Sequence, residues 1–314
     1  MPQSTAGAFL APLTAEAEGL PRWLAAGAGP QACAAVKAHP GFPQAMRTAA
    51  QGIVDAFDNH PLLNRVLNDR GRMIFSFLAF YLDALPEGGG ITAARMTALC
   101  QATGLCSHGR AKALLALMRW SGYLAPAAGT GDRRERPLAP TARMWTSFRG
   151  RWRMHFCAMR PLGGAAEDAI AGLDDPLFCR ALVLAIGEGF RHGFRVLDGA
   201  PALAPFADRD GGIMVFFALL VAAEAERPPT VAELARRFHL SRTHVLQILR
   251  DAMDAGLVAR APGRSSEHQG YGLTAAGRDV LADFFATSFA VLDCTASRAV
   301  ADRAAAAAEG APPE

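Results

Sequence analysis

The chain has 314 residues, of which 51% are hydrophobic and 19% charged, and this composition excludes a disordered protein. The formal net charge is only +3, so any contact with nucleic acid must come from a local patch of charge. Six scattered cysteines without a CxxC pair, together with the absence of a leader-like start or a long uninterrupted apolar run, predict a reduced, cytoplasmic protein that does not bind a membrane.

Two blocks of sequence recur in the same order, which predicts an internal duplication. PLLNRVLNDRGRMIFSFLAF from Pro61 is similar to PALAPFADRDGGIMVFFALL from Pro201, and SHGRAKALLALMRWSGYL from Ser107 is similar to SRTHVLQILRDAMDAGLV from Ser241. The separations of 140 and 134 residues differ by insertions that loops tolerate. Because the identity is low, chance similarity between helical segments is the alternative.

The repeat divides the chain into five predicted parts. These are an N-terminal extension (1–39), unit 1 (40–155), a connector (156–175), unit 2 (176–290) and a C-terminal helix with a frayed tail (291–314). Pro161, Gly163 and Gly164 mark the connector as a break between the units.

Unit 1 carries the weaker copy of the pattern. Its segment ALCQATGLCSHGRAKALLALMRWSGYL predicts two helices joined by a turn, with Ser107 at the start of the second and Gly122 at its end. The polar, arginine-rich segment GTGDRRERPL follows and is expected to form a wing. The next stretch, RMWTSFRGRWRMHFCAM, interleaves aromatic residues with arginines, which is compatible with base stacking. Its aromatic residues recur close to helical spacing, so we expect them to pack in a core; they are Trp145, Phe148, Trp152 and Phe156.

Unit 2 carries the clearer copy. Thr230 is expected to cap a first helix, a tight turn follows at His239, and Ser241 is expected to cap a second helix that ends at Gly256. The predicted buried faces hold Val231, Leu234, Ala235, Phe238, Val245, Ile248, Leu249 and Ala252. LVARAPGRSSEHQGYGLT then predicts a β-hairpin, and a last helix begins near Thr274.

This order of elements predicts a mainly α protein with small β-hairpins, built as tandem winged helix-turn-helix domains from an internal duplication. VAELARRFHLSRTHVLQILRDAMDAGLVAR, followed by YGLTAAGRDVL, resembles the MarR family of bacterial transcription regulators, with LSRTHV, AGLV and LTAAG as the features that carry the resemblance. It covers about 75 residues of unit 2 and matches unit 1 more loosely. Family members usually pair as homodimers, so the resemblance implies a pseudo-dimer within one chain. It also implies a small-molecule effector, which nothing in the sequence identifies, and association of two chains as a homodimer stays open.

The second helix of unit 2 carries the main candidates for contact with double-stranded DNA. Its first two turns and its outward arc hold Ser241, Arg242, Thr243, His244, Gln247 and Arg250, and the hairpin adds Arg260 and Arg264. A helix start in the major groove brings backbone N–H groups and short polar side chains to phosphates and base edges. Gln247 is of a type that pairs with adenine, and Arg242 is better placed for a phosphate. The alternative is a solvated polar face on a domain that binds proteins.

Unit 1 carries a second set of candidates, which are Ser107, His108, Arg110, Lys112, Arg133, Arg134 and Arg136. Its outward arc is otherwise made of small or apolar residues, Gly109, Ala113, Ala116 and Leu117. We therefore expect unit 1 to grip the DNA backbone while unit 2 reads bases, at a target site with unequal halves about one DNA turn apart. The alternative is that unit 1 has lost contact with DNA and only supports the fold.

No motif in the chain indicates catalysis. HExxH, GxSxG and GxxxxGK[ST] are absent, so we expect no enzyme activity, no catalytic residue, no cofactor and no metal. Cys100, Cys106 and His108 lie close together in sequence, but their spacing matches no standard ligand motif, and a thiol or metal sensor is the less favoured interpretation.

The sequence as a whole predicts a nucleoid-associated transcription regulator. Repression is favoured over activation because it needs only occupancy of a promoter. Two other functions stay open: a plasmid-type replication initiator, which would normally be much more basic than +3, and a winged-helix adaptor that binds proteins instead of DNA.

Overall fold

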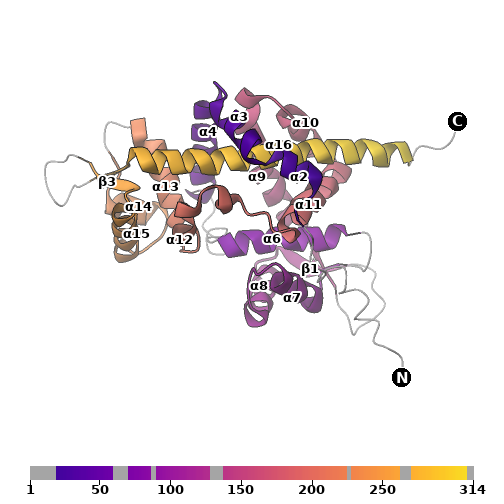
Figure 1. Cartoon of the computed structure of the whole chain (residues 1–314). Helices are drawn as coiled ribbons and strands as arrows, with labels where there is room; N and C mark the ends of the chain where they lie inside the picture. Colours follow the sequence, from indigo (N-terminus) through magenta and orange to yellow (C-terminus); the bar gives the residue numbers. More distant parts are fainter. Residues whose placement is uncertain are drawn as a thin grey trace.

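The computed structural model describes residues 19–58, 70–85, 90–127, 137–224, 228–261 and 270–309. These residues are mainly helical and form two small antiparallel β-hairpins, as the sequence predicts. The C-terminal helix α16 (Ala275–Glu309) runs along most of the length of the molecule (Figure 1). The buried side chains of both hairpin regions belong to one continuous hydrophobic core.

The predicted N-terminal extension is part of this body. Helices α2 (Arg22–Gly27) and α3 (Pro30–Ala38) pack against α16, and Lys37 Nζ lies 2.6 Å from Asp283 Oδ1. Helix α4 (Phe42–Asp58) follows and reaches into the core with Phe42, Ala45, Ala49 and Val54.

The first helix–hairpin segment begins with α6 (Arg70–Ala84). It continues through α7 (Ala93–Ala102), α8 (His108–Trp120), β1 (Leu124–Pro126), β2 (Leu138–Pro140) and α9 (Ala142–Met159). Strands β1 and β2 pair antiparallel with Leu124 opposite Pro140, and Ile91, just before α7, adds a bridge to Leu138.

A series of helices, most of them short, connects the two hairpin segments. They are η1 (Arg160–Leu162), α10 (Ala166–Gly172), α11 (Pro176–Arg191), η2 (Val196–Gly199), η3 (Pro201–Leu203), α12 (Ala204–Ala207), α13 (Gly212–Val221) and η4 (Ala222–Glu224). Asp175 caps α11 by accepting a hydrogen bond from the Leu177 N–H at 2.8 Å. Helix α13 is apolar on nearly all sides because it lies inside the core.

The second helix–hairpin segment repeats the order of the first. It contains α14 (Val231–Arg237), α15 (Arg242–Asp254), β3 (Val258–Arg260) and β4 (Tyr271–Leu273), and it ends in α16. Thr230 and Glu233 form a capping box at the start of α14, and Thr230 also bridges to Gly270, as Ile91 does to Leu138.

The backbone takes the same path at the end of α8 and at the end of α15. Gly122 and Gly256 both have positive φ, +73° and +72°, which is the left-handed conformation that ends a helix. The hydroxyl of Thr141 donates to the Gly122 carbonyl at 2.8 Å, and the hydroxyl of Thr274 donates to the Gly256 carbonyl at 2.7 Å. Each threonine also caps the helix that follows its hairpin.

The two segments interlock in a reciprocal way. Helix α4 packs along α9 and across α13, while α11 packs along α16 and across α6. The far end of α4 contacts the residue that follows α14, since the ring centroids of Phe57 and Phe238 are 5.6 Å apart. In the other direction, Arg195, just after α11, donates to the carbonyl of Thr103 at the end of α7 at 2.8 Å.

The helices run past two of the predicted boundaries. The boundary at 155 falls inside α9 and the boundary at 290 falls inside α16, because one helix in each case is both the end of a hairpin segment and a packing surface for the next element. The C-terminal helix is predicted with a frayed tail from Ala301, but α16 continues to Glu309. Alanine favours helix, and Arg298 and Arg303 form ion pairs with Asp302 and Asp175.

Among the described residues, α16 alone is long and apolar enough by length and composition to cross a membrane. Half of its apolar stretch is buried against the protein itself, with α2, α3, α10 and α11 as its main neighbours. A core helix accounts for these properties.

Candidate nucleic-acid interface

Helix α15 is a capped amphipathic helix with one exposed polar side. The Ser241 hydroxyl accepts a hydrogen bond from the His244 N–H at 3.1 Å, as an N-cap does. The predicted inner stripe is confirmed, since Val245, Ile248, Leu249 and Ala252 are buried. Five of the candidate contact residues on this helix are exposed: Ser241, Arg242, Thr243, Gln247 and Arg250.

The loop that precedes α13 contacts the polar side of α15 at two residues, His244 and Asp251. His244 is half-buried, and its Nε2 lies 3.0 Å from the Asp210 carbonyl oxygen, so Nε2 carries the proton and donates. Arg209 forms an ion pair with Asp251, which also accepts from Gln247 at 2.7 Å. The hydrogen bond from Arg209 lowers the pKa of the Asp251 carboxyl, so this carboxylate stays charged. The loop therefore fixes the orientation of α15.

The hairpin that follows α15 places Arg260 on the surface. Arg260 lies at the end of β3, opposite Tyr271 in β4, and its side chain is exposed. Arg264, the other candidate on this hairpin, lies outside the described residues.

Helix α8 has the same cap but a different outer surface. The Ser107 hydroxyl accepts from the Arg110 N–H at 3.4 Å, and Ser107, His108, Arg110 and Lys112 are all exposed. The rest of the outward side is formed by Ala113, Ala116, Leu117 and Trp120, and Trp120 is 78% exposed. Arg133, Arg134 and Arg136 lie outside the described residues.

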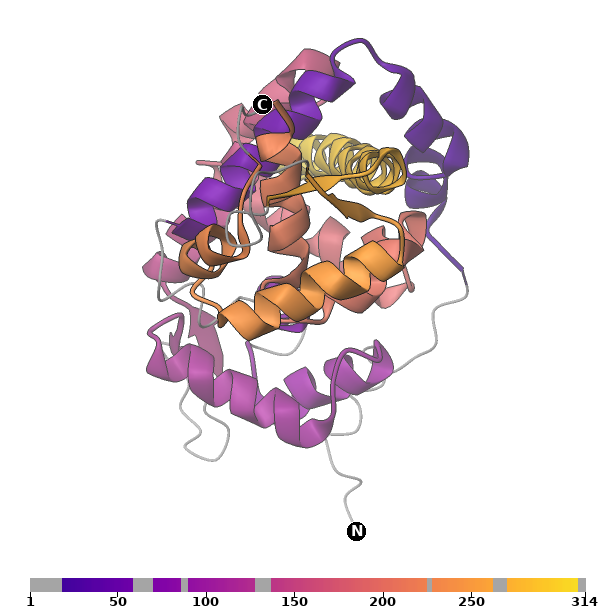
Figure 2. The same cartoon turned by 90° about the vertical axis from the view of Figure 1, so that its left-hand side faces the viewer.

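The outward side of α8 and the start of α15 border one open cleft of about 590 Å³. Figure 2 shows the orange helix α15 above the purple helices α7 and α8 on the side that faces the viewer. The lining residues are Arg72, Arg110, Ala113, Leu114, Leu117, Asp208, Arg209, Asp210 and His244. The structure thus brings Arg110 of unit 1 and His244 of unit 2, two predicted site residues, to the same cleft.

Four charged lining residues were not singled out as site residues from the sequence: Arg72, Asp208, Arg209 and Asp210. A signal was present, because the repeated blocks NDRGR and ADRDG both carry an Asp-Arg pair directly before a strongly apolar helix. Their approach to α8 and α15 depends on how distant elements pack, which local patterns do not show.

The aromatic residues of α9 form a core, as their spacing predicts. Phe148, Trp152 and Phe156 are buried, and the rings of Trp145 and Phe148 contact Phe80 of α6 at centroid distances of 4.5 and 4.8 Å. These rings are therefore engaged inside the protein and are not placed to stack on bases.

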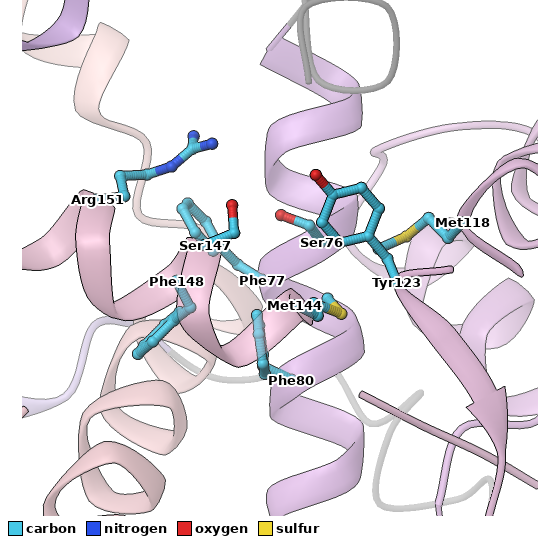
Figure 3. A pocket seen from close by; sticks show the side chains of 9 residues that line it. All are labelled: Ser76, Phe77, Phe80, Met118, Tyr123, Met144, Ser147, Phe148 and Arg151. Atoms are coloured by element: carbon cyan, nitrogen blue, oxygen red, sulfur yellow. The ribbon is translucent and has the colours of Figure 1, made fainter. Parts of the chain in front are cut away.

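A small cavity of about 20 Å³, enough for about one water molecule, lies beside this core. Figure 3 shows Arg151 and the hydroxyl groups of Ser147, Ser76 and Tyr123 near this cavity, with the rings of Phe80 and Phe148 below them. Arg151 Nη1 contacts the Met73 sulfur at 2.8 Å, and burial lowers the pKa of this guanidinium. Burial, and to a lesser extent the Arg151 charge, lowers the pKa of His155 to about 4, so its ring is neutral at pH 7.

The cysteines do not assemble a metal site in the described part of the chain. All six are free thiols, and no group of three or more His, Cys, Asp or Glu side chains is placed to hold a metal ion there. Cys100 is buried, and burial together with the neighbouring Cys106 thiol raises the pKa of Cys100. A thiol with a raised pKa is a poor nucleophile at pH 7.

No family model matches the chain, and neither a curated protein nor a solved structure matches it significantly.

Proposed function

We propose that the protein is a sequence-specific, double-stranded DNA-binding transcription regulator, built from two winged helix-turn-helix units of MarR-like type. The observation that carries the proposal is the α14–α15 pair with the β3–β4 hairpin. Here a Ser241-capped helix presents an exposed polar start, and an exposed arginine lies on the hairpin beside it. A winged helix-turn-helix protein uses this combination in the major groove and on the flanking backbone.

The repeated geometry supports a pseudo-dimer within one chain. The bridges at Ile91 and Thr230, the glycine turns at Gly122 and Gly256, and the reciprocal packing of α4 and α11 recur in both halves. Pairs of elements that contact each other reciprocally are characteristic of a two-fold dimer. One chain then supplies both units that a homodimeric regulator takes from two chains.

Repression is the simpler regulatory outcome of this architecture, because binding across a promoter is sufficient to block it. A regulator of this kind acts in the cytoplasm on the nucleoid. A small-molecule effector would act by changing the orientation of the two units, and no described residue identifies its chemistry.

One observation favours a second candidate function, a winged-helix adaptor that binds protein. Trp120 is 78% exposed at the end of α8, next to Ala116 and Leu117, and exposed aromatic residues are enriched in protein interfaces. If the protein is such an adaptor, unit 1 contacts the protein partner. Substitutions on the polar side of α15 should then leave partner binding unchanged.

The test is selection of genomic DNA fragments by the full chain, followed by sequencing, and then binding of the selected site by variants. Arg242→Ala combined with His244→Ala is expected to abolish preference for the selected site over random duplex. Arg22→Ala removes one exposed arginine from α2 and is the matched control, expected to leave the preference unchanged. Retained preference in the double variant would refute the role assigned to α15.

A further inference from the structure

The cleft between α8 and α15 sets how far apart the two candidate DNA-contacting surfaces lie. Arg110, Ala113, Leu114 and Leu117 form one wall, and they lie on one side of α8 over two turns. His244, in the first turn of α15, lies on the opposite wall. Arg110 of α8 and His244 of α15 line this one cleft, whereas half-sites in successive major grooves lie about 34 Å apart.

The described residues of the two units are packed together in a way that opposes an increase in this spacing. Helices α4 and α11 cross between the units, and the buried residues of both belong to one hydrophobic core. Arg237 of α14 also lies 3.4 Å from Asp55 of α4, and Arg195 bonds to the end of α7. Moving α8 and α15 apart by tens of ångströms would break packing that is continuous through the molecule.

The charges around the cleft indicate which part of DNA its two walls would meet. Arg72 and Arg110 lie in the cleft with Asp208, Arg209, Asp210 and His244. Arg209 is paired with Asp251, and the His244 ring is bonded to the Asp210 carbonyl, so both are held in place. The Ser241-capped start of α15 adds the positive end of a helix dipole close by. Arg110 is the charged side chain that α8 contributes to the lining of the cleft, and a guanidinium can bind phosphate oxygens.

We propose that the chain binds one compact DNA segment instead of two half-sites a turn apart, with the start of α15 in a major groove and Arg72 and Arg110 on phosphates at the edge of that same groove. This inference rests on the proposed function and replaces the one-turn spacing expected from the sequence. Arg72 and Arg110 then contribute affinity that does not depend on base sequence, while the exposed side chains of α15 carry the preference.

The first arm of the test is a series of duplexes from 10 to 24 base pairs centred on the selected site, with the dissociation constant measured for the full chain. If the site is compact, affinity should stop increasing with duplex length at about 12 to 14 base pairs, because a duplex of this length contains the whole groove and the phosphates at its edges. Two half-sites a turn apart need about 20 base pairs. An affinity that rises until about 20 base pairs would overturn the inference and leave the proposed function intact.

The second arm is the salt dependence of binding by Arg72→Gln combined with Arg110→Gln. Each lost phosphate contact lowers the slope of log affinity against log salt by about 1, so the double variant is expected to lose about 2. The loss should be equal for selected and random duplex. Arg119→Gln, on the same helix but outside the cleft, is the matched control and should keep the wild-type slope. An unchanged slope in the double variant would overturn the inference, whereas no binding of any duplex by the wild-type chain would overturn the proposed function as well.

Discussion

Helices α8 and α15 have the same length and the same kinds of helix ends, but they carry different exposed side chains. Each has 13 residues, begins after a capping serine and ends in a glycine turn. The outer side of α15 carries Arg242, Thr243 and Gln247, whereas the aligned positions of α8 hold His108, Gly109 and Ala113. If the protein binds DNA as proposed, the polar side chains of α15 are better suited than those of α8 to contact base edges.

The helices that follow the two hairpins differ in a parallel way. Aligned on Thr141 and Thr274, the buried residues Phe148 and Trp152 of α9 correspond to Leu281 and Phe285 of α16. Arg151 and His155 of α9, however, correspond to Phe284 and Ser288. Unit 1 thus holds a cation and a histidine where the other unit needs neither to build its core.

The largest effect is expected at the contact between the units. A methyl group at Gly187 of α11 would lie 2.2 Å from Tyr81 Cδ2 of α6, and the ring is enclosed by the core. Gly187→Ala is expected to lower the free energy of unfolding by about 3 kcal/mol. Chemical denaturation measures this change.

Gly52→Ala in α4 is the matched control for Gly187→Ala. Its methyl group would meet Met154 Cγ at 2.6 Å, and a methionine side chain can move away. The expected change is within about 1 kcal/mol, since alanine also favours helix. Equal destabilisation by both variants would show that the contact between the units is no more rigid than that within unit 1.

The second effect is a pH dependence that belongs to unit 1 alone. His155 has a folded-state pKa of about 4, below the ordinary value of about 6.5, so the unfolded chain binds its proton first as the pH falls. The titration of His155 leaves the free energy of unfolding unchanged above pH 6.5 and lowers it as the pH falls from 6.5 to 4. The loss is about 2 kcal/mol, after allowance for the partial exposure of the ring. Urea denaturation at a series of pH values measures it.

His155→Gln removes the titrating group and should flatten the stability curve between pH 6.5 and 4. Arg151→Met removes the neighbouring charge, so the pKa of His155 should rise and the loss should become smaller. A wild-type curve with the same slope as that of His155→Gln would contradict the assignment.

The smallest effect compares the two helix caps. Ser107→Ala and Ser241→Ala each remove one hydrogen bond to a helix N-terminus, so each should lower the free energy of unfolding by about 1 kcal/mol. DNA affinity should separate them, because Ser241 also lies at the surface proposed to enter the groove. A larger loss of affinity in Ser107→Ala would reverse the roles proposed for the two units.

The parts that the sequence predicted are those that depend on neighbours in the chain. Thr230 and Ser241 cap their helices, His239 makes a left-handed turn with φ of +53°, and Gly256 ends α15. Each follows from hydrogen bonding or sterics over a few residues. The buried stripe of α15 and the aromatic core of α9 follow from periodicity in the same way.

The parts that the sequence did not predict depend on packing between distant elements. Arg72 of α6 and Arg209 of the loop before α13 line the same cleft although they are distant in sequence. The ion pair between Arg209 and Asp251 joins residues that are 42 positions apart, so no local sequence pattern indicates it. The length of α16 was missed for a similar reason, since its alanine-rich end is held by Asp175 of a remote segment.

The central claim is that this chain binds double-stranded DNA, and fluorescence anisotropy with labelled duplex over a range of salt concentrations tests it most directly. The account predicts binding to random duplex at low salt, tighter binding to the selected site, and affinity that falls linearly on a log–log plot as salt rises. Absence of binding at low salt, or an affinity that does not change with salt, would contradict it.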